Sequence, residues 1–134
     1  MNGAAAIVRR ARSLVGVPFR PQGRDPGAGV DCVGLAAFAA DVSPDAVPRN
    51  YALRGEHLAR LEHCLAALGF MPIPHGNGLP GDILVAESGP QQVHLAVISE
   101  TGLVHADAKL GRVAERPGEA PWPVRSIWRL SEVG

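Results

Sequence analysis

The chain has 134 residues, a length that fits one domain with a hydrophobic core of its own. Lysine and arginine together number 13 and aspartate and glutamate also number 13, so no charge excess points to a nucleic-acid binder. Hydrophobic residues make up 46% of the sequence, which argues against disorder, yet no apolar run is long enough for a transmembrane helix. We therefore expect one globular domain over residues 1–134, with neither nucleic acid nor a membrane as its partner.

Helical periodicity is confined to the first half of the chain. Apolar residues recur three and four positions apart in segments that glycine and proline interrupt, and the predicted helices are 4–15, 32–40 and 56–68. Gly16 ends the first of these helices and Gly69 ends the last. A loop rich in glycine, proline and arginine fills 17–31, and the proline-containing stretch 42–51 is expected to be irregular.

After residue 70 the pattern changes to that of strands. A loop rich in proline and glycine is followed by short apolar or alternating segments, and the predicted strands are 82–87, 93–99, 103–107, 112–115 and 124–130. The Thr101-Gly102 turn joins the second and third of these strands into a hairpin. Helices first and strands after is an α+β pattern, so we predict N-terminal helices packed on an antiparallel β-sheet meander.

One cysteine stands where chemistry is expected. The glycine-rich loop gives way to helix formers at Cys32, which places this residue in the first turn of a helix. A helix N-terminus carries partial positive charge and free N–H groups, and both stabilise a thiolate and lower the pKa of a cysteine. His94 and His105 fall on neighbouring predicted strands, at a spacing that brings them side by side in a hairpin. A cysteine at a helix start with histidines on facing strands is typical of covalent thiol catalysis.

Three short blocks occur in a fixed order: Asp31-Cys32-Val33-Gly34-Leu35, Gly81-Asp82-Ile83-Leu84 and Val93-His94-Leu95-Ala96-Val97-Ile98, with His105-Ala106 following. In this order they resemble the NlpC-type family of cysteine peptidases, bacterial and phage enzymes that cut the peptide stems of peptidoglycan. The resemblance implies a papain-like α+β core and an endopeptidase or amidase that needs no metal or organic cofactor. It matches Cys32 to the nucleophile, His94 to the general base and His105 to the group that orients the base. Asp107 is the alternative for that last role.

The loop before Cys32 departs from the usual family pattern. Pro21 stands where the family often has a tyrosine whose hydroxyl lines the pocket, and Val33 replaces the usual serine. The Arg24-Asp25-Pro26 loop resembles the shorter subgroup found in phage tails and gene-transfer agents. That resemblance implies a chain carried with tail proteins as partners and acting in the periplasm or cell wall. At the N-terminus, Arg9, Arg10 and Arg12 follow the first apolar stretch, which is the reverse of the order in a signal peptide, so we expect synthesis in the cytoplasm without a secretion signal.

Four residues are candidates for contacts with the peptide stem: Arg20, Arg24, Asp31 and Tyr51. The two arginines either pair with carboxylates of an acidic stem or stay solvated or bound to neighbouring aspartates. For Asp31 the alternative is a helix cap.

Structural interpretations stand beside the functional ones. Cys32 can be an ordinary buried cysteine, and His94 and His105 can be histidines with a structural role. Residues expected to have only structural or surface roles are Cys64 in the core, His57, His63 and His75 on the surface, and Trp122 and Trp128 against the last strand. At the level of function, the alternatives are an acyl or amide transferase on the same core and a non-catalytic tail component.

Overall fold

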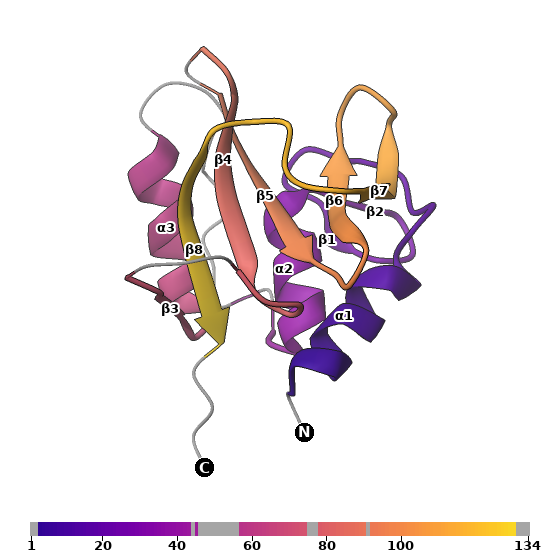
Figure 1. Cartoon of the computed structure of the whole chain (residues 1–134). Coiled ribbons are helices and arrows are strands. Elements are labelled where there is room, and N and C mark those ends of the chain that lie inside the picture. Colours follow the sequence, from indigo (N-terminus) through magenta and orange to yellow (C-terminus); the bar gives the residue numbers. More distant parts are fainter. Residues whose placement is uncertain (1–2, 44, 46–56, 75–77, 91, 131–134) are drawn as a thin grey trace.

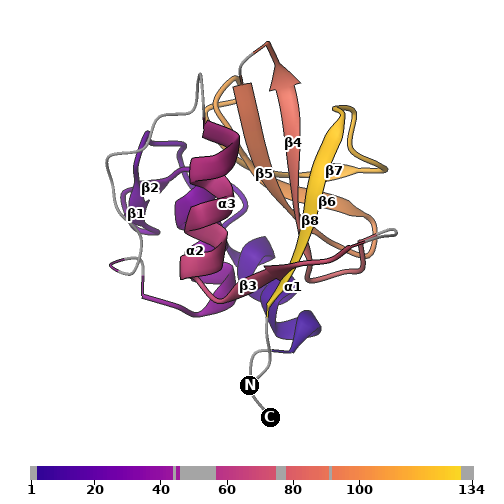
Figure 2. The same cartoon turned by 90° about the vertical axis from the view of Figure 1, so that its left-hand side faces the viewer.

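The computed structural model describes residues 3–43, 45, 57–74, 78–90 and 92–130. Its helices are α1 (Ala4–Ser13), α2 (Cys32–Ala40) and α3 (His57–Ala67), and its strands are β1 (Arg24–Asp25), β2 (Gly29–Val30), β3 (Phe70–Pro72), β4 (Ile83–Gly89), β5 (Gln92–Ile98), β6 (Gly102–Asp107), β7 (Arg112–Pro117) and β8 (Val124–Leu130). The helices lie on one side of the larger sheet (Figures 1 and 2). Within the described ranges, no helix is both long and apolar enough to cross a membrane.

The predicted α+β class is confirmed, and the predicted helices and strands are present within about two residues of their expected ends. Three short strands were not predicted: the paired β1 and β2 inside the loop 17–31, and the edge strand β3. Segments of two or three residues are too short to carry a hydrophobic period, so no pattern in the sequence marks them.

The larger sheet has the strand order β3-β8-β4-β5-β6-β7, and its neighbouring strands are antiparallel. The predicted meander holds for β4 to β7, whereas β8 returns to the far side of β4 instead of following β7. The alternation in β8 tells which of its residues face the core, but it does not tell which strand becomes its neighbour.

The sheet separates two apolar clusters. Alternate residues of β4 and β5, such as Val85 and Leu95, face the helices and join the main core. Helix α2 is buried on nearly all sides, and its Leu35 is 1% exposed. A smaller cluster that includes Leu84 and Ala96 covers the opposite face, which we call the outer face. Because side chains alternate along a strand, His94 shares the outer face with Ala96.

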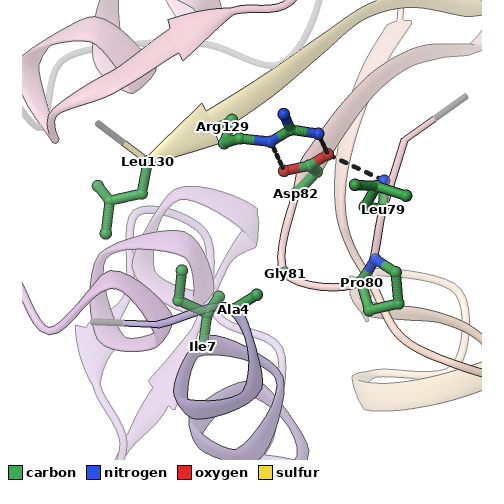
Figure 3. Close-up of a pocket in the computed structure, with 8 residues that line it drawn as sticks. All are labelled: Ala4, Ile7, Leu79, Pro80, Gly81, Asp82, Arg129 and Leu130. Atoms are coloured by element: carbon green, nitrogen blue, oxygen red, sulfur yellow. Dashed lines mark hydrogen bonds and ion pairs between the residues drawn. The ribbon is translucent and has the colours of Figure 1, made fainter. Parts of the chain in front are cut away.

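The Gly81-Asp82 block ties the start of β4 to its surroundings (Figure 3). Gly81 has a φ of +95°, and a Cβ at this position would collide with the backbone of Ala4 at the start of α1. The Asp82 carboxylate accepts two hydrogen bonds of 2.9 Å from Arg129 on β8 and one of 2.9 Å from the Leu79 N–H. These contacts hold β4, β8 and α1 together, so the block is part of the scaffold.

Candidate active site

The loop 17–31 is held tightly against the first turn of α2. A Cβ on Gly34 would collide with the carbonyl of Gly23, so glycine is required where these two backbones meet. Asp31 caps the helix: one carboxylate oxygen accepts from the Gly34 N–H at 2.9 Å and the other from the Gln22 N–H at 2.9 Å. The Asp31 residue is 0% exposed, so the predicted substrate contact is replaced by the alternative role as a helix cap.

Cys32 is the first residue of α2 and is 2% exposed. Burial raises the pKa of its thiol above the ordinary value, and the negative charge of Asp31 raises it further. Amide N–H groups of Leu95, Val33 and Cys32 itself face the sulfur and lower the pKa by less. The expected lowering of this pKa is therefore wrong, because desolvation outweighs the helix terminus. The resting group is a neutral thiol.

The two histidines lie on the outer face and touch. The Nε2 atom of His94, on β5, lies 2.8 Å from the Nδ1 atom of His105, on β6, and the two rings meet nearly edge-on at 87°. The contact that the hairpin spacing predicts is present. Asp107 instead accepts hydrogen bonds from the backbone N–H groups of Lys109 and Leu110, so His105 is the group that contacts His94.

Burial keeps both imidazoles neutral. It lowers the pKa of His94 from the ordinary 6.5 to about 4, with the neighbouring His105 lowering it further and the charge of Asp107 opposing both. Burial also lowers the pKa of His105, where Asp107 again opposes the shift and the charge of Arg116 adds to it. Because Nε2 of His94 is occupied by His105, Nδ1 is the nitrogen that remains. When Nε2–H donates to His105, Nδ1 carries a lone pair and can accept a proton.

Cys32 and His94 line one pocket of about 280 Å³. The rest of its lining is largely apolar: Phe19, Pro21, Ser88, Gln92, Val93, Ala106 and Ala108. We call this the thiol pocket. An adjoining hollow of about 310 Å³ shares His94 with it and continues past His105 to Lys109 and Arg116. His94 therefore stands between the thiol and a more polar hollow.

The predicted substrate arginines lie beside the thiol pocket and are not part of its lining. Arg20 and Arg24 line a further hollow of about 470 Å³, which meets the thiol pocket at Pro21. Arg20 is exposed, whereas Arg24 is only 8% exposed. Burial raises the pKa of Cys64, and the charge of Arg24 opposes that rise. Tyr51 lies outside the described residues.

Sequence reasoning missed Trp122 as a neighbour of the histidines. Both tryptophans were expected to pack with the last strand. Trp128 belongs to β8 and lies in the main core, whereas Trp122 packs against the outer cluster and its indole contacts both imidazole rings. Trp122 is far from both histidines in the sequence, and only the return of β8 to β4 brings it to them. No local pattern could have revealed this contact.

Two of the other structural expectations are confirmed, and two lie outside the described residues. Cys64 is 2% exposed in the main core and His63 is exposed, as predicted, while His75 and the side chain of His57 are outside the description. Within the described ranges, no three histidine, cysteine, aspartate or glutamate side chains gather as ligands for a metal ion.

No protein-family model and no curated protein matches the sequence, but solved structures match the fold. The peptidoglycan hydrolase RipB from Mycobacterium tuberculosis aligns with a TM-score of 0.61 and 23% identity over 96% of this chain, which spans 65% of the RipB chain. The NlpC/p60 domain of the peptidoglycan hydrolase SagA aligns with a TM-score of 0.58 and 23% identity, over 86% of this chain and 89% of that one. The P60 domain of the M. avium subspecies paratuberculosis antigen MAP1204 aligns with a TM-score of 0.58 and 21% identity, over 95% and 93%. The chain therefore has the fold of NlpC/p60 domains.

Proposed function

We propose that this protein is a cysteine peptidase that hydrolyses an amide bond in the peptide stems of bacterial peptidoglycan. Cys32 is the nucleophile, His94 is the general base and His105 orients the base. The observation that carries the proposal is the shared pocket: Cys32 and His94 line it together, and His105 holds His94 by its Nε2 atom. The likeness in fold to structures described as peptidoglycan hydrolases supports the choice of substrate.

The reaction starts from a neutral thiol and a neutral imidazole. Nδ1 of His94 takes the thiol proton while the Cys32 sulfur forms a bond to the substrate carbonyl carbon. Amide N–H groups of Leu95 and of Cys32 itself, which already face the sulfur, stabilise the negative charge that develops on the carbonyl oxygen. The carbon–nitrogen bond then breaks, and the His94 imidazolium gives its proton to the leaving amine. An acyl thioester remains on Cys32.

Water completes the cycle. His94 takes a proton from the water as its oxygen attacks the thioester carbonyl, and the proton returns to the Cys32 sulfur as the acid leaves. The raised pKa of the thiol makes its sulfur the stronger nucleophile once its proton has gone, and the lowered pKa of His94 makes the transfer of that proton the demanding part of the step. Proton transfer to His94 during the attack makes a preformed thiolate unnecessary.

We further propose that the enzyme acts at the cell wall as part of a phage-like tail or gene-transfer-agent particle, with tail proteins as partners. The support is the resemblance of the Arg24-Asp25-Pro26 loop to that subgroup. In the fold, Arg24 and Asp25 form β1, and Pro26 begins the turn that leads from β1 to β2. Mass spectrometry of purified particles from the producing cells tests the proposal. Finding the chain at constant stoichiometry with tail proteins supports it, and particles without the chain contradict it.

Digestion of purified diaminopimelate-type peptidoglycan tests the enzymatic function, with the products identified by mass spectrometry. Cys32→Ala removes the nucleophile, and Cys64→Ala is the matched control because Cys64 is the other buried free cysteine. The proposal predicts new stem fragments from the wild type and from the control, and none from Cys32→Ala. Fragments that persist in Cys32→Ala, or a wild type without products, contradict it. Amide products formed only with added amines identify a transferase instead.

A further inference from the structure

Trp122 completes a cluster of three aromatic rings with the two histidines. The indole and the His94 ring have centroids 5.0 Å apart at an interplanar angle of 70°. For the indole and the His105 ring the values are 5.6 Å and 66°. Each ring of the cluster therefore meets the other two edge-on, an arrangement that aromatic rings favour and that fixes their relative orientation.

The topology of the sheet explains how Trp122 reaches this place. Strand β7 lies at one edge of the sheet and β8 lies beyond β4, so their connection must cross β6, β5 and β4 (Figure 1). The helices cover one face, and the connection crosses the outer face. Immediately after Trp122, the carbonyl of Pro123 accepts a 2.9 Å hydrogen bond from the Glu87 N–H on β4. The neighbouring β4 residue, Ala86, pairs with His94. The backbone beside Trp122 is thus fixed next to the histidines.

Charged groups surround this cluster. The Arg116 guanidinium, from β7, lies 5.9 Å from the centre of a Trp122 ring. Arg116 and Lys109 line the hollow beside the histidines together with Asp107 of β6, and Cys32, at the start of α2, lines the thiol pocket together with His94. The indole therefore lines the same hollow as the two histidines and the exposed cations.

We propose that Trp122 is a positioning residue for His94 and His105. Its indole clamps the two imidazoles in the orientation that leaves Nδ1 of His94 for the thiol, and it excludes water from their shared hydrogen bond. The consequence for catalysis depends on the proposed function, whereas the clamp itself can be measured without a substrate.

NMR titration of the histidine side chains tests the clamp directly. Trp122→Leu keeps an apolar side chain but removes the ring, Trp122→Phe keeps a ring, and Trp128→Phe is the matched control on the other face of the sheet. In Trp122→Leu we expect water to reach the imidazole, so that the pKa of His94 rises from about 4 towards the ordinary 6.5. The shift should be smaller in Trp122→Phe and absent in Trp128→Phe. An unchanged pKa of His94 in folded Trp122→Leu overturns the proposal.

Activity supplies a second readout. Trp122→Leu should lower kcat/KM on stem peptides by about tenfold or more and move the acidic limb of its pH profile upwards, and Trp122→Phe should recover most of the rate. A purely structural tryptophan would leave the pH profile in place. If the wild type cuts no peptidoglycan, the proposed function fails while the histidine titration still decides whether the clamp exists.

Fluorescence of Trp128→Phe, in which Trp122 is the remaining tryptophan, decides the matter should Trp122→Leu not fold. A protonated imidazole quenches an indole in contact with it. Emission should therefore decrease as the pH is lowered and the histidines become protonated. Circular dichroism over the same pH range should show an intact fold. Constant emission across that range overturns the proposal.

Discussion

Replacing His105 tests how the base is held. In His105→Ala, the His94 Nε2–H loses the acceptor that lies 2.8 Å away, in a place where His105 itself is 3% exposed. A buried donor without a partner costs about 1–3 kcal/mol, because its water has been removed and nothing replaces it. If that cost falls on the productive orientation of His94, kcat/KM drops by about fivefold to about 150-fold, at roughly 1.4 kcal/mol per factor of ten.

The matched variants separate this effect from a general loss of stability. His105→Asn restores an acceptor oxygen and should recover part of the lost rate. His63→Ala, an exposed position on α3, should leave the rate unchanged. The assay is steady-state cleavage of a soluble stem peptide, with circular dichroism to establish that each variant is folded. A folded His105→Ala with the wild-type kcat/KM would refute the reasoning.

Three further predictions concern the pKa of His94, the ion pair between Arg12 and Glu115, and the close backbone approach at Gly34. The value of kcat/KM should decrease only as the pH falls through about 4, because burial lowers the pKa of His94 from 6.5 to about 4. An acidic limb near pH 6.5 would contradict the burial argument. The hydrogen bond from Arg12 lowers the pKa of Glu115 to about 2, so its stabilisation is complete above pH 4.5 and is lost as the pH falls towards 2. Urea unfolding should show Glu115→Gln to be less stable than the wild type by roughly 1 kcal/mol at pH 7, and a gap that persists at pH 2 argues against the ion pair. Gly34→Ala should lower the free energy of unfolding by roughly 2 kcal/mol, because the added Cβ would collide with a loop carbonyl. The control Gly27→Ala, in that loop, meets only ordinary contacts and should change the free energy of unfolding little. Equal stabilities of the two variants would count against the close approach.

The sequence predicted the elements and the contact between the histidines well, because local patterns determine both. A change from loop composition to helix formers marks Cys32, and it is the first residue of α2. The spacing of His94 and His105 across a hairpin places their side chains on one face, where they touch. These features need only the neighbouring residues and the geometry of strands.

The features that were missed depend on the whole fold. The position of Cys32 at a helix start predicted a lowered pKa, but burial of the thiol, with β5 packed over it, removes water and raises the pKa. Trp122 reaches the histidines because β8 lies beside β4, and nothing in the segment around Trp122 encodes that order. Burial and long-range strand order thus decide the electrostatics of the site.

Covalent labelling with a stem peptide that carries a chloromethyl ketone in place of the scissile amide tests the central claim most directly. Peptide mapping by mass spectrometry locates the adduct in the wild type, in His94→Ala and after competition with the unmodified stem peptide. We expect one adduct on Cys32 and none on Cys64, slowed by the competitor and by the loss of His94. Equal labelling of both cysteines, or labelling of Cys32 that needs neither His94 nor the stem peptide, would contradict a Cys32–His94 active site.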